Sequence, residues 1–207
     1  MKEDFYFTIQ SQLRAPDLRV KGSRFIANIF PVSNKEEIEH ALGLVRKEFH
    51  DARHHSFAYR LGVDGRLLRA ADDGEPNGIA GRPILLVLTS QKLTNVLLVV
   101  TRYFGGTKLG MGGLARAYAE AAQQAVSMSK IVRVYLTTSV EVQVRYEDLP
   151  QMERLIAAFD GAIQESTYLD SVTLRVVLRR SMVDQFLHAV TDTLHGRANA
   201  ISYSVVA

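Results

Sequence analysis

The stretch VTRYFGGTKLGMGGLARAY, residues 100–118, decides how the front half of this chain is built. Five glycines fall within nine positions of it, and it carries three cations and no carboxylate. The cations are Arg102, Lys108 and Arg116. An apolar run, NVLLVV, leads into the stretch, and an alanine-rich run, LARAYAEAAQQAV, leads out of it. This pattern predicts a buried strand, then a flexible cationic loop, then a helix.

The segments around this stretch predict an α/β unit. Apolar residues alternate in the expected strands and recur at helical spacing in the expected helices. Ser33 or Asn34 can cap the first helix, and Asp64-Gly65 is a hairpin turn signal. In chain order we expect a strand over 23–32, a helix over 33–51, a hairpin over 56–72, a short helix over 83–91, a strand over 94–104 and a helix over 113–128.

The rear of the chain predicts a second unit with the element order β-α-β-β-α-β, which is that of a ferredoxin-like split βαβ domain. Asp148 and Ser181 are the expected N-caps of its helices, and Gly196 the expected end of the second. The expected elements are a strand over 134–146, a helix over 148–159, two strands over 161–180 with a turn near Asp170, a helix over 181–196 and a strand over 199–207. We therefore expect an α+β chain with domains 1–130 and 131–207.

Composition narrows the class of protein. The chain has 207 residues, of which 47% are hydrophobic, and a net charge of +3 that is concentrated in the basic front part. It has no cysteine, which excludes disulfides, thiolate zinc sites and a cysteine nucleophile. The N-terminus lacks the apolar region of a secretory signal, and no apolar run approaches the roughly 20 residues that span a bilayer. We expect a cytoplasmic protein with no membrane partner.

The glycine-rich loop has two interpretations, which the spacing leaves open. A helix N-terminus attracts anions, glycines let the backbone approach closely, and lysine and arginine bind phosphate oxygens. Alternatively, the glycines serve tight turns and close packing between helix and strand. The loop matches neither of the standard nucleotide-binding glycine patterns. The candidate phosphate- or nucleic-acid-binding residues are Arg102, Tyr103, Gly105, Gly106, Lys108, Gly112, Gly113 and Arg116.

The segment DDGEPNGIAGRP, residues 72–83, is rich in turn residues and acids. Asp72, Asp73 and Glu75 suit a hard cation such as Mg²⁺, although their spacing matches no standard site. We favour a supporting role, in which this acidic loop pairs with Arg82, Arg102 or Arg116 and fixes the glycine loop. No catalytic residue, metal or cofactor is expected.

Two adjacent histidines and three aromatic residues are further candidates. His54 and His55 point to opposite faces of a strand, so they cannot share a metal, although one of them could be a ligand with Asp51. A structural role is the favoured interpretation. Tyr103, Phe104 and Tyr118 interleave with the loop cations, as in proteins that stack single-stranded nucleic acid. We expect Phe104 to be buried and leave the two tyrosines open.

Three motifs, in this order, resemble the signature block of the IMPACT family in its bacterial form. They are ARHHSFAYR, ADDGEPNGIAGRPIL and NVLLVVTRYFGGTKLGMGGLARAYAEAA, within residues 51–122. The tail from Ile131 is similar to the small C-terminal domain of bacterial members. The resemblance implies a front domain with the fold of ribosomal protein S5 domain 2, an α/β sandwich, and a rear ferredoxin-like domain similar to one in elongation factor G.

The resemblance also implies a function. It favours a non-enzymatic protein that binds RNA, the ribosome or another nucleic acid and modulates translation. One alternative is an enzyme that acts on a phosphorylated small molecule or nucleotide with Mg²⁺. The other is a protein-interaction module whose rear sheet docks a partner, for instance in translation. The identity of the partner and the oligomeric state stay open at this point.

Overall fold

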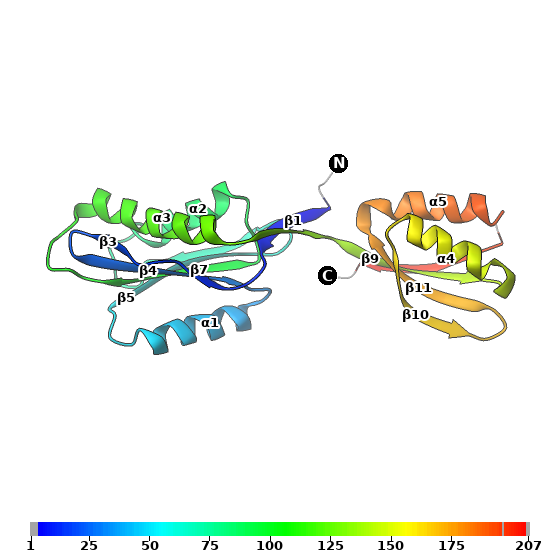
Figure 1. Ribbon diagram of the computed structural model, residues 1–207, viewed down its shortest axis with the longest axis horizontal. Coiled ribbons are helices and arrows are strands. Elements are labelled where there is room, and N and C mark those ends of the chain that lie inside the picture. The colour runs from blue at the N-terminus through cyan, green and yellow to red at the C-terminus, as the bar shows by residue number, and fades with distance from the viewer. Residues whose placement is uncertain (1–3, 196, 206–207) are drawn as a thin grey trace. The chain divides into compact units, whose positions relative to one another are not determined.

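The computed structural model describes residues 4–195 and 197–205, and the contacts between residues divide the chain into two units. The front unit spans Tyr6–Val134, and the rear unit runs from Tyr135 onward and includes Asp4 and Phe5. Strands β1 (Phe5–Ile9) and β8 (Ile131–Tyr135) pair with each other in a two-stranded sheet. Figure 1 shows the helices and strands of both units.

The front unit is built on one antiparallel sheet, with the strand order β2-β4-β7-β5-β6 and β3 paired to β4. The strands are β2 (Leu13–Arg14), β3 (Leu18–Val20), β4 (Ser23–Pro31), β5 (His54–Leu61), β6 (Leu67–Ala71) and β7 (Val96–Tyr103). The residues Val96 to Val100 are wholly buried because β7 lies between β4 and β5 and is covered on both faces. The prediction of a buried strand leading into the glycine loop is thus confirmed.

Helices cover both faces of this sheet (Figure 1). Helix α1 (Lys35–Glu48) packs on one face, and α2 (Gly81–Ser90) and α3 (Gly110–Met128) pack on the other. Successive side chains of a strand point to opposite faces, so Leu97 belongs to the core under α1 and Leu98 to the core under α2 and α3. The front unit therefore has three layers and two apolar cores.

Helix α1 begins at a predicted cap. Asn34, one of the two predicted caps, accepts a hydrogen bond from the backbone N–H of Glu37 at 2.8 Å, and the Glu37 carboxylate accepts one from the N–H of Ser33 at 2.7 Å. This is a reciprocal capping arrangement. Helix α3 begins at Gly110 rather than at the predicted Gly113. Its first turn forms despite its glycines because the later turns are anchored in the core.

The rear unit has a four-stranded antiparallel sheet with the order β10-β11-β9-β12 and two helices on one face (Figure 1). Its elements are β9 (Thr137–Val144), α4 (Leu149–Ala158), β10 (Ala162–Tyr168), β11 (Val172–Arg179), α5 (Val183–Thr193) and β12 (Asn199–Val205). The predicted order β-α-β-β-α-β and the α+β class are confirmed.

Asp148 stands at the N-cap position of α4 as predicted, although its side chain makes no capping hydrogen bond. The predicted cap Ser181 is wrong, because Met182 is the N-cap residue of α5. A short 3₁₀ turn precedes each helix, Tyr146–Asp148 before α4 and Arg180–Met182 before α5, and it carries the chain into the first helical turn. The Asp148 carboxylate instead accepts hydrogen bonds from Arg197, at 2.8 and 3.2 Å. The Ser181 hydroxyl donates to the carboxylate of Asp4. Gly196, the predicted end of α5, lies outside the described residues.

Candidate functional site

Two helices of the front unit begin at the same end of the sheet. Strands β6 and β7 are both antiparallel to β5, so they run in the same direction. Strand β6 leads through residues 72–80 into α2, and β7 leads through residues 104–109 into α3. The acidic loop and the glycine loop therefore emerge together, beside the start of β5 and its two histidines.

A buried ion pair joins these two loops. Arg102, near the end of β7, donates a hydrogen bond from Nη1 to Oε1 of Glu75 at 2.7 Å. The two side chains are only 8% and 4% exposed. The hydroxyl of Tyr118 on α3 donates to the same oxygen at 2.7 Å, and burial raises the pKa of Tyr118, which keeps its proton in place. Glu75 thus ties the acidic loop to β7 and to α3.

This pairing argues against the predicted role of Arg102 as a phosphate ligand. Its guanidinium is buried, is neutralised by Glu75, and lies 5.6 Å from the ring centres of both Phe25 and Phe104. A charge that is already paired inside the protein does not attract an anionic partner as a free one does. Of the three arginines expected to pair with the acidic loop, Arg102 is the one that pairs with Glu75.

The three aromatic residues are placed differently from expectation. Phe104 is 57% exposed, although we expected it to be buried, because β7 ends at Tyr103 and the next side chain leaves the sheet to lie against the Arg102 guanidinium. Tyr118 is wholly buried and packs edge-on against Phe25. Tyr103 is half-buried and donates its hydroxyl to the carboxylate of Asp51 at 2.5 Å.

The loop glycines fall into two groups. Gly105 lies in a crowded corner, since a Cβ atom there would stand 1.8 Å from the carbonyl carbon of Gly22. Gly106 has an open environment and a positive φ of +85°. Gly112 and Gly113, in the first turn of α3, have room for a Cβ: the nearest atoms would be Nη1 of Arg116 at 3.6 Å and Cβ of Leu109 at 3.5 Å. The packing interpretation therefore explains Gly105 and does not explain Gly112 or Gly113.

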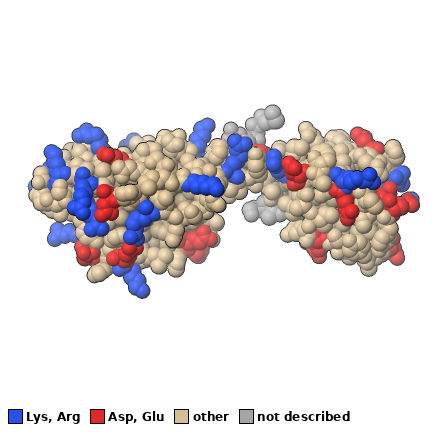
Figure 2. All heavy atoms as spheres, in the orientation of Figure 1, with Lys and Arg blue, Asp and Glu red and all other residues tan. Residues whose placement is uncertain are grey.

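The remaining cations stand beside this open part of the loop. Lys108 and Arg116 are exposed, as is Arg82 at the start of α2, and none of them forms an ion pair within the described part of the chain. Helix α3 has no side-chain cap and no acid in its first turn. In Figure 2, Lys and Arg side chains stand out on the end of the front unit where α3 begins. Exposed cations thus flank the start of α3, whose backbone N–H groups are not capped by a side chain.

At the start of α2, by contrast, backbone N–H groups already have a side-chain acceptor. Asp72 accepts hydrogen bonds from the N–H groups of Gly78, Ala80 and Gly81 at 2.8, 2.9 and 2.9 Å. Burial on its own would raise the pKa of Asp72, but these three donors outweigh it and lower the pKa below its usual value. Asp73 accepts from the N–H of His55 at 2.7 Å. With Glu75 paired to Arg102, all three acids have internal partners, and the magnesium-dependent alternative loses its expected ligands.

The two histidines lie on opposite faces of β5 and have structural partners. Nδ1 of His54 lies 2.9 Å from the carbonyl oxygen of Asp73, and Nδ1 of the buried His55 lies 3.0 Å from Oγ1 of Thr101. Burial lowers the pKa of His55, which keeps the ring neutral. Across residues 4–195 and 197–205, no three histidine and acidic side chains gather closely enough to hold a metal ion.

The sequence of the front unit matches a known family. Residues 21–126 match the family described as the Impact N-terminal domain. The chain belongs to the IMPACT family. Its three signature motifs predicted this membership, which is confirmed. Residues 142–197, in the rear unit, match a second family, described as a domain of unknown function, DUF1949.

The relatives include bacterial and eukaryotic proteins. The chain is 36% identical to the IMPACT family member YigZ of Escherichia coli (strain K12), over 86% of this chain and 88% of that protein. It is 30% identical to YvyE of Bacillus subtilis (strain 168), over 94% and 89%. The rabbit Protein IMPACT is 33% identical over 44% of this chain and 29% of its own length. A crystal structure of a hypothetical protein, 33% identical, superposes with a TM-score of 0.67 over 96% of this chain and 98% of that one.

Some site residues were not singled out from the sequence. Gly22 faces Gly105 through a backbone contact between distant segments, which leaves no local signal in either segment. The burial of Tyr118 does have a signal, because it lies four residues after Leu114 on the apolar stripe of α3.

No helix among the described residues has the length and apolarity needed to cross a bilayer.

The buried pair predicts a stability effect. Arg102→Met leaves the Glu75 carboxylate buried without its cation, which should cost about 3–5 kcal/mol in the free energy of unfolding measured with urea. Adding Glu75→Gln removes the stranded charge and keeps an acceptor for Tyr118, so the double variant should recover stability. Arg66→Met, which breaks an exposed ion pair with Asp64, should cost less than about 1 kcal/mol. A double variant no more stable than Arg102→Met alone would contradict the role of this pair.

The cap of α2 predicts a pH dependence. Because the folded-state pKa of Asp72 is lowered, its stabilisation is present above the unfolded pKa of about 3.9 and is lost as the pH falls through the folded value. Asp72→Asn should therefore destabilise the protein by about 1–2 kcal/mol at pH 7. In urea titrations the gap between wild type and variant should narrow below about pH 4. If the difference in free energy of unfolding between wild type and Asp72→Asn stayed constant from pH 7 to pH 3, the Asp72 carboxylate would not be the stabilising group.

Proposed function

We propose that this protein binds single-stranded RNA, free or within the ribosome, through the glycine loop and the first turn of α3, and that it acts in the regulation of translation in the cytoplasm. Membership of the IMPACT family supports the link to translation. The observation that carries the proposed binding site is the uncapped, glycine-lined start of α3 beside two exposed cations.

Phosphate contacts come from side chains and backbone together. Lys108 supplies a mobile ammonium, and Arg116, one turn into α3, supplies a planar guanidinium that can bind two phosphate oxygens. Free N–H groups and the helix dipole at the start of α3 add attraction for the same anion. Contacts of this kind hold a nucleic acid without reading its sequence.

The glycines in the first turn of α3 support this assignment. Alanine would favour a helix over glycine by roughly 0.5–1 kcal/mol at each position. Gly112 and Gly113 both have room for the extra methyl group, so the fold itself does not require glycine there. Glycine keeps the backbone bare, which lets a phosphate approach the N–H groups.

Phe104 supports single-stranded over double-stranded RNA. Its ring is 57% exposed and is braced by the guanidinium of Arg102, which Glu75 in turn holds in place. An exposed aromatic ring beside cations can stack an unpaired base, with about 1–3 kcal/mol per base. Arg102 thus acts as a positioning residue for Phe104 rather than as a phosphate ligand, and the buried Tyr118 is not available for stacking.

We also propose that each unit has the fold of a domain found in a protein of the translation machinery. One sheet between α1 on one face and α2 and α3 on the other fits the sandwich of ribosomal protein S5 domain 2. The strand order of the rear sheet fits a ferredoxin-like domain similar to that in elongation factor G. We propose that these units correspond to the two domains expected from the sequence, 1–130 and 131–207, although the contacts between residues divide the chain between Val134 and Tyr135.

RNA binding can be measured with a fluorescent mixed-sequence single-stranded oligoribonucleotide at several salt concentrations. Lys108→Ala should weaken binding and reduce the slope of log K against log salt by about 0.7, because one phosphate contact is lost. Gly112→Ala should weaken binding without destabilising the fold. Lys35→Ala removes another exposed lysine, at the start of α1, and should leave binding unchanged. If the oligonucleotide does not bind at low salt, or if Lys108→Ala behaves like Lys35→Ala, the proposal fails.

Stacking on Phe104 can be separated from charge. Phe104→Leu keeps an apolar side chain but removes the aromatic face, so affinity for single-stranded RNA should fall by about 1–3 kcal/mol. Phe104→Tyr should retain most of the affinity. A fluorescent base analogue in the oligonucleotide should be quenched by the wild type and not by Phe104→Leu. Equal binding of duplex and single strand, unchanged in Phe104→Leu, would exclude stacking while leaving phosphate contact intact.

A further inference from the structure

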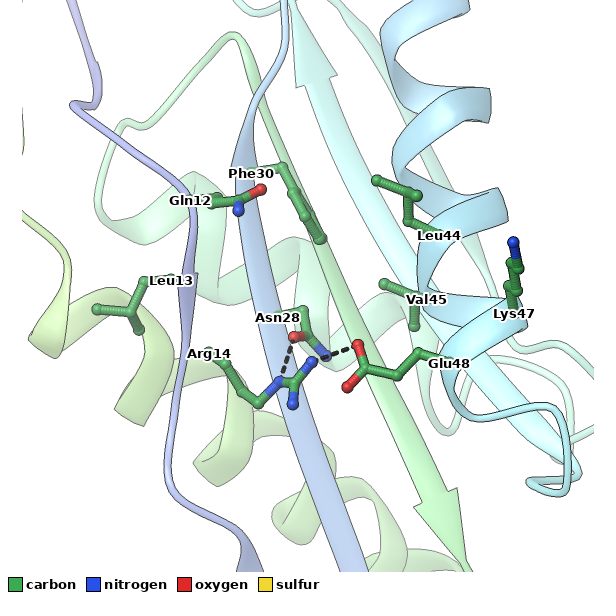
Figure 3. Close-up of a pocket in the computed structure, with 9 residues that line it drawn as sticks. All are labelled: Gln12, Leu13, Arg14, Asn28, Phe30, Leu44, Val45, Lys47 and Glu48. Carbon is green, nitrogen blue, oxygen red and sulfur yellow. Dashed lines mark hydrogen bonds and ion pairs between the residues drawn. The ribbon is translucent and has the colours of Figure 1, made fainter.

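A pocket lies on the other face of the front sheet, beside α1 (Figure 3). Its volume is about 710 Å³, within the range of about 300–1,000 Å³ that holds small organic ligands. Strands β2 and β4 form one wall and the C-terminal half of α1 forms the other. Nothing in the proposed RNA site uses this pocket, which is lined by Gln12, Leu13, Arg14, Asn28, Phe30, Leu44, Val45, Lys47 and Glu48.

The pocket has an apolar part. Phe30 of β4 and Leu44 of α1 face each other across it in Figure 3, with Val45 beside them. Leu44 is 49% exposed, although it lies on a helix that buries its other large apolar residues Ile38, Leu42 and Val45. A second hollow of about 590 Å³ shares Gln12, Phe30 and Leu44 with the first. The apolar part therefore has room for a body longer than a single ring.

The other end of the pocket has a buried amide with an unused donor. Asn28 is 4% exposed, and its Oδ1 accepts a hydrogen bond from Nε of Arg14 at 3.1 Å. Its Nδ2 is buried and has no hydrogen-bond acceptor among the described residues. A buried donor without a partner is unfavourable, and most such groups in proteins are satisfied. A ligand oxygen at this end of the pocket could accept a hydrogen bond from Nδ2 of Asn28 and satisfy this donor.

An exposed ion pair covers this amide. Arg14, directly opposite Asn28 in the β2–β4 pairing, forms an ion pair with Glu48 of α1. Both side chains are about half exposed, 47% and 48%, and the Arg14 guanidinium also lies 5.0 Å from the ring centre of Phe49. Exposed pairs of this kind contribute little to stability. An incoming carboxylate can therefore replace that of Glu48 at little cost while the guanidinium keeps its place on Phe49.

We propose that this pocket binds an organic carboxylate with an apolar body. The carboxylate takes the place of Glu48 on Arg14 and accepts a hydrogen bond from Nδ2 of Asn28. The exposed ammonium of Lys47, which has no ion-pair partner in the described part of the chain, adds attraction. The apolar body lies on Phe30 and Leu44. The ligand is either a free small acid or the C-terminal end of an apolar peptide, which present the same chemistry.

The test uses 4-phenylbutyrate, its neutral analogue 4-phenylbutyramide and the dipeptide acetyl-Leu-Phe with a free carboxylate. Each is titrated into the full chain by calorimetry and by nuclear magnetic resonance of the Asn28 side-chain amide. At least one carboxylate should bind ten times more tightly than the neutral amide and should shift the Asn28 resonances. Tighter binding of the dipeptide identifies a peptide end as the ligand, and tighter binding of phenylbutyrate identifies a free acid.

Three variants separate this site from nonspecific attraction. Arg14→Gln should lower the affinity for the preferred carboxylate at least tenfold. Glu48→Gln removes the internal competitor and should raise that affinity several-fold, a gain that a merely structural pair does not predict. Arg66→Gln breaks a comparable exposed pair with Asp64 and should change nothing. Absence of binding by both carboxylates, equal binding of the neutral amide, or unmoved Asn28 resonances would each overturn the proposal.

Discussion

The buried pair between Arg102 and Glu75 is the constraint on which the proposed RNA site depends. An ion pair removed from water is favourable only if its geometry is good and its polar groups find further partners. Glu75 meets that condition by accepting from Tyr118 as well. The Arg102 guanidinium lies 5.6 Å from two aromatic ring centres, and its Nε is buried without a hydrogen-bond partner among the described residues. The pair joins a turn-rich loop, the central strand and the longest helix of the front unit. Arg102 is the last residue but one of β7, so the pair holds the chain just before the glycine loop begins.

From that fixed point the loop divides into a closed part and an open part. Its first residues are held by contact: Gly105 packs against Gly22, and its N–H donates to the hydroxyl of Ser23 at 3.2 Å. Its last residues enter α3, whose first turn contains two glycines with room for a Cβ atom and no acidic residue. Phe104 lies just before Gly105 and Lys108 lies just before α3; one is apolar and the other charged, and both are exposed. The two interpretations of the glycines therefore apply to different residues of one loop. Close packing explains Gly105, and phosphate binding is proposed for Gly112 and Gly113.

Much of the fold could be predicted from the sequence, because most of its elements carry strong local signals. The apolar run of β7, the stripe and cap of α1, and the β-α-β-β-α-β order of the rear unit are examples. The residues of the candidate site were harder to predict, because the sequence shows the sign of a charged side chain but not whether that side chain is buried. Arg102 and Lys108 look alike there, and only the packing of Glu75, Phe25 and Tyr118 separates the buried cation from the exposed one. The burial of an aromatic side chain at the end of a strand is equally hard to read, so Phe104 was wrongly expected to be buried. The burial of Tyr118 could have been predicted from the apolar stripe of α3. The pocket beside α1 could not be foreseen, since its lining comes from three separate segments of chain.

The most direct measurement is a set of backbone amide resonances recorded while a single-stranded oligoribonucleotide is added to the full chain. The account predicts that the largest shifts fall between Phe104 and Arg116, above all at Gly112 and Gly113, while the amides of the Asp72-capped start of α2 change little. If the oligonucleotide binds and the large shifts lie on the rear unit or along α1, with the start of α3 unperturbed, the glycine loop is not the RNA-binding surface.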